Sequence, residues 1–171
     1  EEIERALKEL RDHGCPEIVL LHCVSEYPAK PEDFHLIDMP RLGERHGTAY
    51  GLSDHSLGHA VAIAATVLGA RVIEKHFALD REEDSIDGAF SMLPLEFGEM
   101  TEAVRVAHRM ASLGPIALKN AKESVLNAEE QTLSDGLKRE RRLFYDLFDT
   151  EDQTEGMTAF LEKRRPTFTG R

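Results

Sequence analysis

The chain contains no tryptophan and only two cysteines, and aromatic residues make up 6% of its 171 residues. The cysteines, Cys15 and Cys23, flank one predicted short strand. An extended run of about eight residues holds them too far apart for an unstrained disulfide. We therefore expect two free thiols and a reducing compartment, which favours a cytoplasmic protein.

The sequence also lacks an excess of basic residues, because 21 Lys and Arg stand against 32 Asp and Glu, for a net charge of -11. Nucleic acids and anionic membrane surfaces bind clustered Lys and Arg, so we expect neither as a partner. No apolar run approaches the roughly 20 residues of a membrane span, and no basic-then-apolar leader indicates a signal peptide.

Two polar triplets, Ser53-Asp54-His55 and Glu74-Lys75-His76, mark the most informative stretch of the chain. Each follows a few residues that are typical of a buried strand. Between them, residues 59–69 have apolar side chains at helical spacing, and Gly69 is placed to end that helix. The carboxyl ends of neighbouring parallel strands meet at one edge of a sheet, so the triplets are predicted to lie side by side.

His55 and His76 are the candidate metal ligands in these triplets. Their separation suits a strand-to-strand repeat and does not suit a single helix or a zinc knuckle. Two imidazoles at one sheet edge can share a metal ion. The alternative is that each histidine is a hydrogen-bonded polar residue at a strand end, and that Glu74 and Asp87 are charges that are solvated or paired with Lys75.

Strand and helix patterns alternate as far as residue 113. The predicted helices are 1–12, 32–44 with an interruption at Pro40, 59–69 and 94–113, and the predicted strands are 18–21, 49–52, 71–73 and 89–92. A complete (β/α)8 barrel needs about 250 residues, more than this chain has. Four strand-helix units therefore predict an α/β fold in which residues 1–113 form half of a TIM-type barrel.

The chain changes character in residues 114–171, where only helical patterns occur. The predicted helices are 116–128, 133–148 and 151–164. Thr150 and Gln153 form a capping box before the last of them. Apolar stripes on these helices predict a helical appendage that covers apolar surface, and we expect a homo-oligomer.

Three motifs in the first segment resemble one family when read together: Leu21-His22-Cys23-Val24-Ser25-Glu26-Tyr27-Pro28, Gly51-Leu52-Ser53-Asp54-His55-Ser56 and Val72-Ile73-Glu74-Lys75-His76-Phe77. They are similar to motifs of the sialic acid synthase family, whose members make sialic, legionaminic or pseudaminic acids. The resemblance covers roughly residues 1–113. It implies a TIM barrel that condenses phosphoenolpyruvate with an N-acyl amino sugar and uses a divalent metal, manganese or magnesium.

The resemblance also implies a role for individual side chains. His55 and His76 match the metal ligands, and Glu74 and Lys75 match catalytic polar groups of the same site. The positions that match substrate-binding residues are Ser53 near the phosphate and Ser25, Tyr27 and Asp87 at the sugar. Ser25 stands where some relatives have Asn, so its sugar contact departs from the family pattern.

The helical segment carries a second resemblance, on the runs Ala117-Leu118-Lys119-Asn120-Ala121-Lys122-Glu123-Ser124-Val125 and Thr150-Glu151-Asp152-Gln153-Thr154-Glu155-Gly156-Met157. These residues resemble the carboxyl end of the enoyl-CoA hydratase (crotonase) family. The resemblance implies helices that pack at subunit contacts and help to close a CoA pocket. The acid/base glutamates and oxyanion-hole amides of that family lie upstream of this segment, and nothing before residue 114 matches them.

Three functions are consistent with these patterns. The first is a synthase-like half-site that is inactive or very weak in this chain, because the family draws most of its phosphate-binding groups from the first half of the barrel. The second is a recombined or designed chimeric scaffold without catalysis. The third is a crotonase-like segment for oligomerisation or CoA contact. Metal binding distinguishes the first function from the other two.

Overall fold

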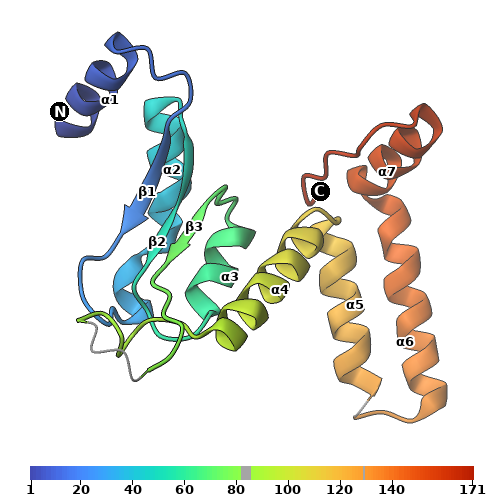
Figure 1. Ribbon diagram of the computed structural model, residues 1–171. Helices are drawn as coiled ribbons and strands as arrows, with labels where there is room; N and C mark the ends of the chain where they lie inside the picture. Colours follow the sequence, from blue (N-terminus) through green and yellow to red (C-terminus); the bar gives the residue numbers. More distant parts are fainter. Residues whose placement is uncertain (82–85, 129) are drawn as a thin grey trace. The chain divides into compact units, whose positions relative to one another are not determined.

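The protein consists of two compact units, Glu1–His108 and Arg109–Arg171, in a computed structural model that describes residues 1–81, 86–128 and 130–171 (Figure 1). The division falls inside one long helix, whereas the sequence patterns place the change of character between residues 113 and 114. In the described ranges, no helix is long and apolar enough to cross a membrane.

A three-stranded parallel sheet forms the framework of the first unit. Its strands are β1 (Val19–Cys23), β2 (Ala49–Asp54) and β3 (Ile73–Lys75), in the spatial order β1-β2-β3 (Figure 1). The three predicted strands of this region are confirmed, and each one ends two residues later in the chain than predicted. Because the strands are parallel, their carboxyl ends lie at one edge of the sheet.

Helices connect these strands, as expected for a parallel sheet. They are α1 (Glu2–Asp12) before β1, the 3-10 turns η1 (Pro31–Phe34) and η2 (Leu36–Asp38) and helix α2 (Met39–His46) between β1 and β2, α3 (Ala60–Val67) between β2 and β3, and α4 (Pro94–Ala111) after β3. The α/β class of this unit is therefore confirmed.

Pro40 begins a helix instead of interrupting one. It lies in the first turn of α2, where a backbone N–H has no partner within the helix and proline is tolerated. The residues before it form two 3-10 turns separated by His35, which has a left-handed φ of 43°. The predicted helix 32–44 is thus wrong in its first half, and the α-helix starts at Met39.

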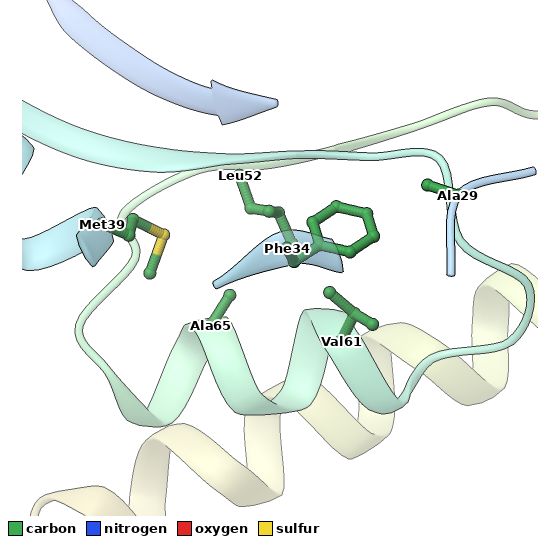
Figure 2. Close-up of a cluster of buried hydrophobic side chains, with 6 residues drawn as sticks. All are labelled: Ala29, Phe34, Met39, Leu52, Val61 and Ala65. Atoms are coloured by element: carbon green, nitrogen blue, oxygen red, sulfur yellow. The ribbon is translucent and has the colours of Figure 1, made fainter. Parts of the chain in front are cut away.

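The main core of the first unit lies between α3 and β2. Figure 2 shows Val61 and Ala65 on the face of α3 that points toward Leu52 of β2. The buried side chains of this cluster are Ala29, Phe34, Met39, Leu52, Val61 and Ala65. A second cluster joins Ala62 of α3 to Met100 of α4. Helix α3 is therefore apolar on two sides, which holds the carboxyl ends of β2 and β3 in place.

The predicted fourth strand at residues 89–92 is not formed. Asp87 accepts hydrogen bonds on its backbone oxygen from Ser91 N (3.1 Å) and Ser91 Oγ (2.7 Å), so the chain turns before it can extend. Only Met92 reaches the sheet edge, through a single parallel bridge to Phe77. The described part of the first unit thus contains three strand-helix units and a bridge, where four units are predicted.

Among the described residues of the second unit, the regular elements are all helices, as predicted. Its elements are α5 (Pro115–Ala128), α6 (Leu133–Asp146), the 3-10 turn η3 (Leu147–Asp149) and α7 (Glu151–Glu162). Thr150 caps α7 by accepting the N–H of Gln153 at 3.1 Å, which confirms the predicted start of this helix. Asn120 of α5 donates to the Leu143 carbonyl of α6 at 3.0 Å and fixes this helix pair.

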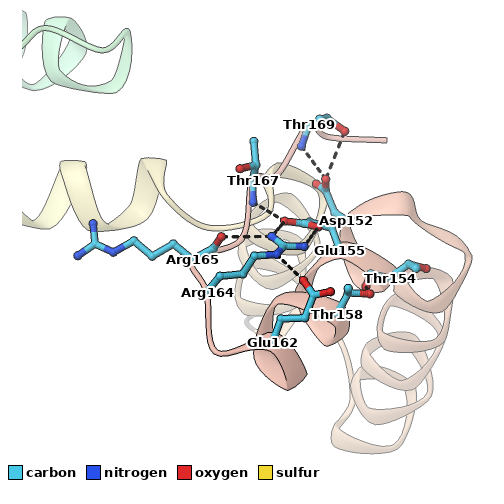
Figure 3. Close-up of polar contacts among 9 residues, drawn as sticks. All are labelled: Asp152, Thr154, Glu155, Thr158, Glu162, Arg164, Arg165, Thr167 and Thr169. Carbon is cyan, nitrogen blue, oxygen red and sulfur yellow. Dashed lines mark hydrogen bonds and ion pairs between the residues drawn. The ribbon is translucent and has the colours of Figure 1, made fainter.

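The carboxyl-terminal residues fold back on α7 through two acidic side chains (Figure 3). Asp152 accepts the N–H groups of Thr169 (2.6 Å) and Gly170 (2.9 Å). Glu155 accepts a two-pronged ion pair from Arg164 at 2.6 and 2.8 Å. This pair, with the N–H of Thr167, lowers the pKa of Glu155 from 4.5 to about 2. The guanidinium of Arg164 therefore binds acidic side chains of α7.

Candidate functional site

The candidate site lies at the carboxyl ends of β2 and β3, where the two polar triplets meet as predicted. The strand register pairs Ser53 with Glu74 and Asp54 with Lys75. The triplets begin inside the strands and not after them, so alternate side chains point to opposite faces of the sheet. The two triplets therefore form two pairs across the strands. Asp54 and Lys75 point to one face of the sheet, and Ser53 and Glu74 point to the other.

Asp54 and Lys75 form the buried pair. Their side chains are 0% and 1% exposed, and Lys75 Nζ lies 2.9 Å from Asp54 Oδ2. Lys75 also donates to the Ser56 carbonyl at 2.5 Å, and Asp54 Oδ1 accepts the N–H of Ser56 at 2.9 Å and its Oγ–H at 2.6 Å. Both charges are thus neutralised and hydrogen-bonded within the protein.

Ser53 and Glu74 form the pair on the opposite face. Ser53 Oγ donates to Glu74 Oε1 at 2.6 Å. Ser53 is buried, whereas Glu74 is exposed. The hydroxyl therefore orients a carboxylate whose second oxygen is accessible to a ligand or to solvent.

His55 follows directly after β2 and is buried. Its Nδ1 lies 2.8 Å from the Val24 carbonyl oxygen. A carbonyl only accepts, so Nδ1 carries the proton and Nε2 keeps its lone pair. A metal-binding histidine usually donates the N–H of its other ring nitrogen to a carboxylate, a backbone carbonyl or water. This hydrogen bond sets the tautomer and the direction of the ring.

His76 follows β3 and stands beside His55. The two ring centroids are 5.1 Å apart, with an interplanar angle of 63°. His76 Nδ1 lies 3.5 Å from Asp87 Oδ2, so the predicted sugar-binding carboxylate lies beside the second imidazole. The structure therefore brings three of the sequence-predicted residues into one group.

Two aromatic rings complete this group. Tyr27 is 51% exposed, and its ring centroid lies 4.2 Å from that of His55 and 5.8 Å from that of His76. The ring centroid of Phe90 lies 5.0 Å from that of His76 and 5.2 Å from that of Tyr27. Sequence reasoning found Tyr27 and missed Phe90, which it placed inside a strand. The turn that replaces this strand brings the Phe90 ring to the site.

Ser25 is exposed, and the described structure gives its Oγ one contact, with Cys23 Sγ at 3.8 Å. That sulfur lies 3.9 Å from His55 Nδ1. Cys15 and Cys23 are both free, as predicted.

Sequence reasoning also missed Asp54 and Ser56 as members of the site, although their places beside His55 in the motif were a usable signal.

The two imidazoles fit a metal ion in an open site. Their nitrogens suit several first-row divalent ions, and one of them is already held in the required tautomer. Among the described residues, no group of three or more His, Cys, Asp and Glu side chains converges on one point. An ion held here would therefore keep positions for water or substrate, as catalytic ions do.

Comparison with known proteins identifies the family of the chain. Residues 1–115 match the NeuB family along two thirds of the chain. The chain belongs to the NeuB family. Residues 94–171 match a second family, enoyl-CoA hydratase/isomerase, and the two matches overlap along α4.

The relatives of the chain include synthases of pseudaminic and other sialic-type acids. The chain is 45% identical to the pseudaminic acid synthase of Helicobacter pylori over 61% of this chain and 31% of that protein. It is 35% identical to the spore coat polysaccharide biosynthesis protein SpsE of Bacillus subtilis over 77% of this chain and 35% of that protein. The chain thus spans about a third of the length of these curated relatives.

Solved structures of NeuB-family proteins share the fold. The N-acetylneuraminic acid synthetase of Leptospira borgpetersenii matches with a TM-score of 0.61 and 30% identity over 77% of this chain and 47% of that one. The crystal structure of SpsE matches with a TM-score of 0.58 and 35% identity over 63% of this chain and 30% of that one. The parallel sheet of this chain is therefore a segment of the NeuB-family fold.

Proposed function

We propose that the first unit carries the metal-ligand part of a nonulosonic (sialic-type) acid synthase site, on strands that correspond to the second half of a (β/α)8 barrel. The observation that carries this proposal is the histidine pair. His55 has a fixed tautomer with Nε2 free, and its ring centroid is 5.1 Å from that of His76. The reaction would join phosphoenolpyruvate to an N-acyl amino sugar in the cytoplasm.

His55 and His76 would hold manganese or magnesium through their ring nitrogens. When bound, the ion would supply Lewis acidity to the sugar aldehyde and orient water. Glu74, held by Ser53, is the candidate for proton handling because its carboxylate is exposed at the site. Lys75 is a weaker candidate for that role, because its ammonium is engaged by Asp54 and Ser56.

The substrate-binding roles follow the same geometry. Asp87 beside His76, and Tyr27 stacked near His55, would contact the sugar. Ser53 would lie near the phosphate, and Ser25 would contact the sugar only from the rim of the site. Phosphate and enolpyruvate need several cations and amides, which the resemblance places in the first half of the barrel. We therefore expect little or no synthase activity from these 171 residues.

Manganese titration by calorimetry tests this function. We expect about micromolar binding by the chain and none by the His55→Ala/His76→Ala double variant, because the variant removes both nitrogen ligands. The control is His13→Ala, since His13 is exposed on the end of α1 and contacts only its own helix. Equal binding by the double variant would contradict the proposed metal site.

A scaffold without catalysis is the second candidate. The observation that favours it is the overlap of the two family matches along α4, which suggests that segments of two families are joined in one helix. A folded, defined oligomer that binds neither manganese nor substrate would support this candidate. The crotonase-like helices would then serve for oligomerisation, and any CoA contact would need a binding test of its own.

A further inference from the structure

The buried ion pair of Asp54 and Lys75 occupies the positions next to both candidate metal ligands. Asp54 precedes His55, and Lys75 precedes His76. The two side chains are the last paired residues of β2 and β3, and they are almost completely buried. A pair in this position can determine how the chain leaves the two strands.

Stability alone does not explain a pair of this kind. Removing two charges from water costs about as much as their attraction returns, and apolar replacements are often as stable. The pair is nevertheless fully hydrogen-bonded. Asp54 Oδ1 accepts both Ser56 groups, while Lys75 Nζ donates to Asp54 Oδ2 and to the Ser56 carbonyl. The network therefore fixes residues 54–56, with His55 between its members, to the end of β3.

We propose that Asp54 and Lys75 are positioning residues that hold His55 and His76 ready to bind one ion. This proposal rests on the proposed function. The network holds residue 55 so that its Nδ1–H stays on the Val24 carbonyl, at 2.8 Å, and its Nε2 stays free beside His76. Neither positioning residue touches substrate, since both are shielded by the protein.

His55 also has contacts outside this network. Its ring lies against that of Tyr27, with centroids 4.2 Å apart, and its Nδ1 lies 3.9 Å from Cys23 Sγ. Its backbone carbonyl accepts the N–H of Ala29 at 3.0 Å. That bond anchors the peptide but leaves the ring direction open. If the ion pair is removed, the segment is expected to turn about this bond and the Val24 hydrogen bond to His55 is expected to weaken.

Nitrogen-15 NMR of the imidazoles tests the proposal without any metal. At about pH 8, above the ordinary imidazole pKa of about 6.5, the chain should show His55 as a single Nδ1–H tautomer. Lys75→Met and Asp54→Asn should show a mixture of tautomers. An unchanged single tautomer in these variants, while they remain folded, would overturn the proposal.

Two further variants separate positioning from folding. Asp54→Leu/Lys75→Met replaces the pair by apolar side chains and is expected to fold, but it should still give mixed His55 tautomers. Val61→Ala shortens a core side chain on α3 and lowers stability without touching the network, so it should keep the single tautomer. Mixed tautomers in Val61→Ala would show that any destabilisation has this effect, and would also overturn the proposal.

Manganese affinity gives the second measurement. Lys75→Met and the double apolar variant should bind at least about tenfold more weakly than the chain itself, as expected when a supporting residue is lost, whereas Val61→Ala should bind normally. Equal affinity in all variants would contradict the positioning role. If the unaltered chain binds no manganese, the proposed function fails, and the tautomer measurement still decides whether Asp54 and Lys75 position His55.

Discussion

At the scale of single residues, the sheet depends on positions where no side chain can be accommodated. A Cβ added to Gly51 in β2 would lie 2.3 Å from the Val72 carbonyl oxygen and 2.8 Å from Leu21 Cδ2. The Val72 carbonyl accepts the Leu52 N–H at 2.9 Å, so it cannot move without weakening the sheet. Gly51 therefore allows β1 and β3 to approach β2 close to the site.

Gly51→Ala is expected to lower the free energy of unfolding by about 2 kcal/mol, through overpacking and loss of the β2–β3 contact. Urea denaturation followed by circular dichroism measures this. The matched control is Gly98→Ala in α4, where nothing lies within 4 Å of the added Cβ. In a helix interior this change should stabilise by about 0.5–1 kcal/mol. A Gly51→Ala variant as stable as the control would contradict the close packing described here.

At the scale of elements, α7 and the residues after it form one hydrogen-bonded piece through Asp152 and Glu155 (Figure 3). The segment after α7 has no helix or strand to hold it. Its order therefore depends on a buried carboxylate that accepts backbone N–H groups and on an ion pair to Arg164. The ion pair requires the ionised carboxylate of Glu155.

Acid should release this segment before it unfolds the helices. The pKa of Glu155 is about 2 in the folded protein against an ordinary 4.5, so its stabilisation is complete above pH 4.5 and is lost as the pH falls toward 2. The protection of the Thr167 N–H from hydrogen exchange, measured relative to the intrinsic rate at each pH, should be lost over this range. In Glu155→Gln, this protection should be low already at neutral pH and change little with acid. A pH dependence equal in both proteins would contradict this assignment.

At the scale of the whole molecule, the second unit leaves many large apolar side chains exposed, and clusters of such side chains commonly mark association surfaces. Ala159 is the one hydrophobic residue that is buried among the described residues of this unit. By contrast, Phe160 and Leu161 of α7 are 78% and 76% exposed. An apolar pocket of about 290 Å³ lies within this unit, between residues that include Ile116 and Met157. These features support the predicted homo-oligomer.

Light scattering coupled to size exclusion should therefore give a mass above that of one 19.2 kDa chain. Phe160→Asp/Leu161→Asp should lower this mass, because charged side chains on an apolar interface oppose association. The control is Ile37→Asp, which alters an equally exposed side chain of the first unit. If all three proteins have the mass of a monomer, the exposed Phe160 and Leu161 do not mediate association between copies of this chain.

Local sequence determined most of the helices and three of the strands. Hydrophobic periodicity, the Thr150 cap and the left-handed Gly69, whose φ is 93°, act within a few residues, so their effects can be predicted without tertiary contacts. The motif also identified His55 and His76. The error at Pro40 arose because His35 has a left-handed φ and Pro40 lies in the first turn of α2, where proline is tolerated. The error at residues 89–92 arose because hydrogen bonds to the Asp87 carbonyl turn the chain there.

Only the tertiary structure decided what surrounds the histidines. The Val24 carbonyl on His55, the Asp54–Lys75 pair and the Phe90 ring on His76 join residues that lie far apart in the chain or on neighbouring strands. Such contacts depend on strand register and on the path of each loop, which a local pattern does not specify. Sequence alone thus pointed to His55, His76, Tyr27 and Asp87, whereas packing determined the hydrogen-bond partner of His55 and brought Phe90 to His76.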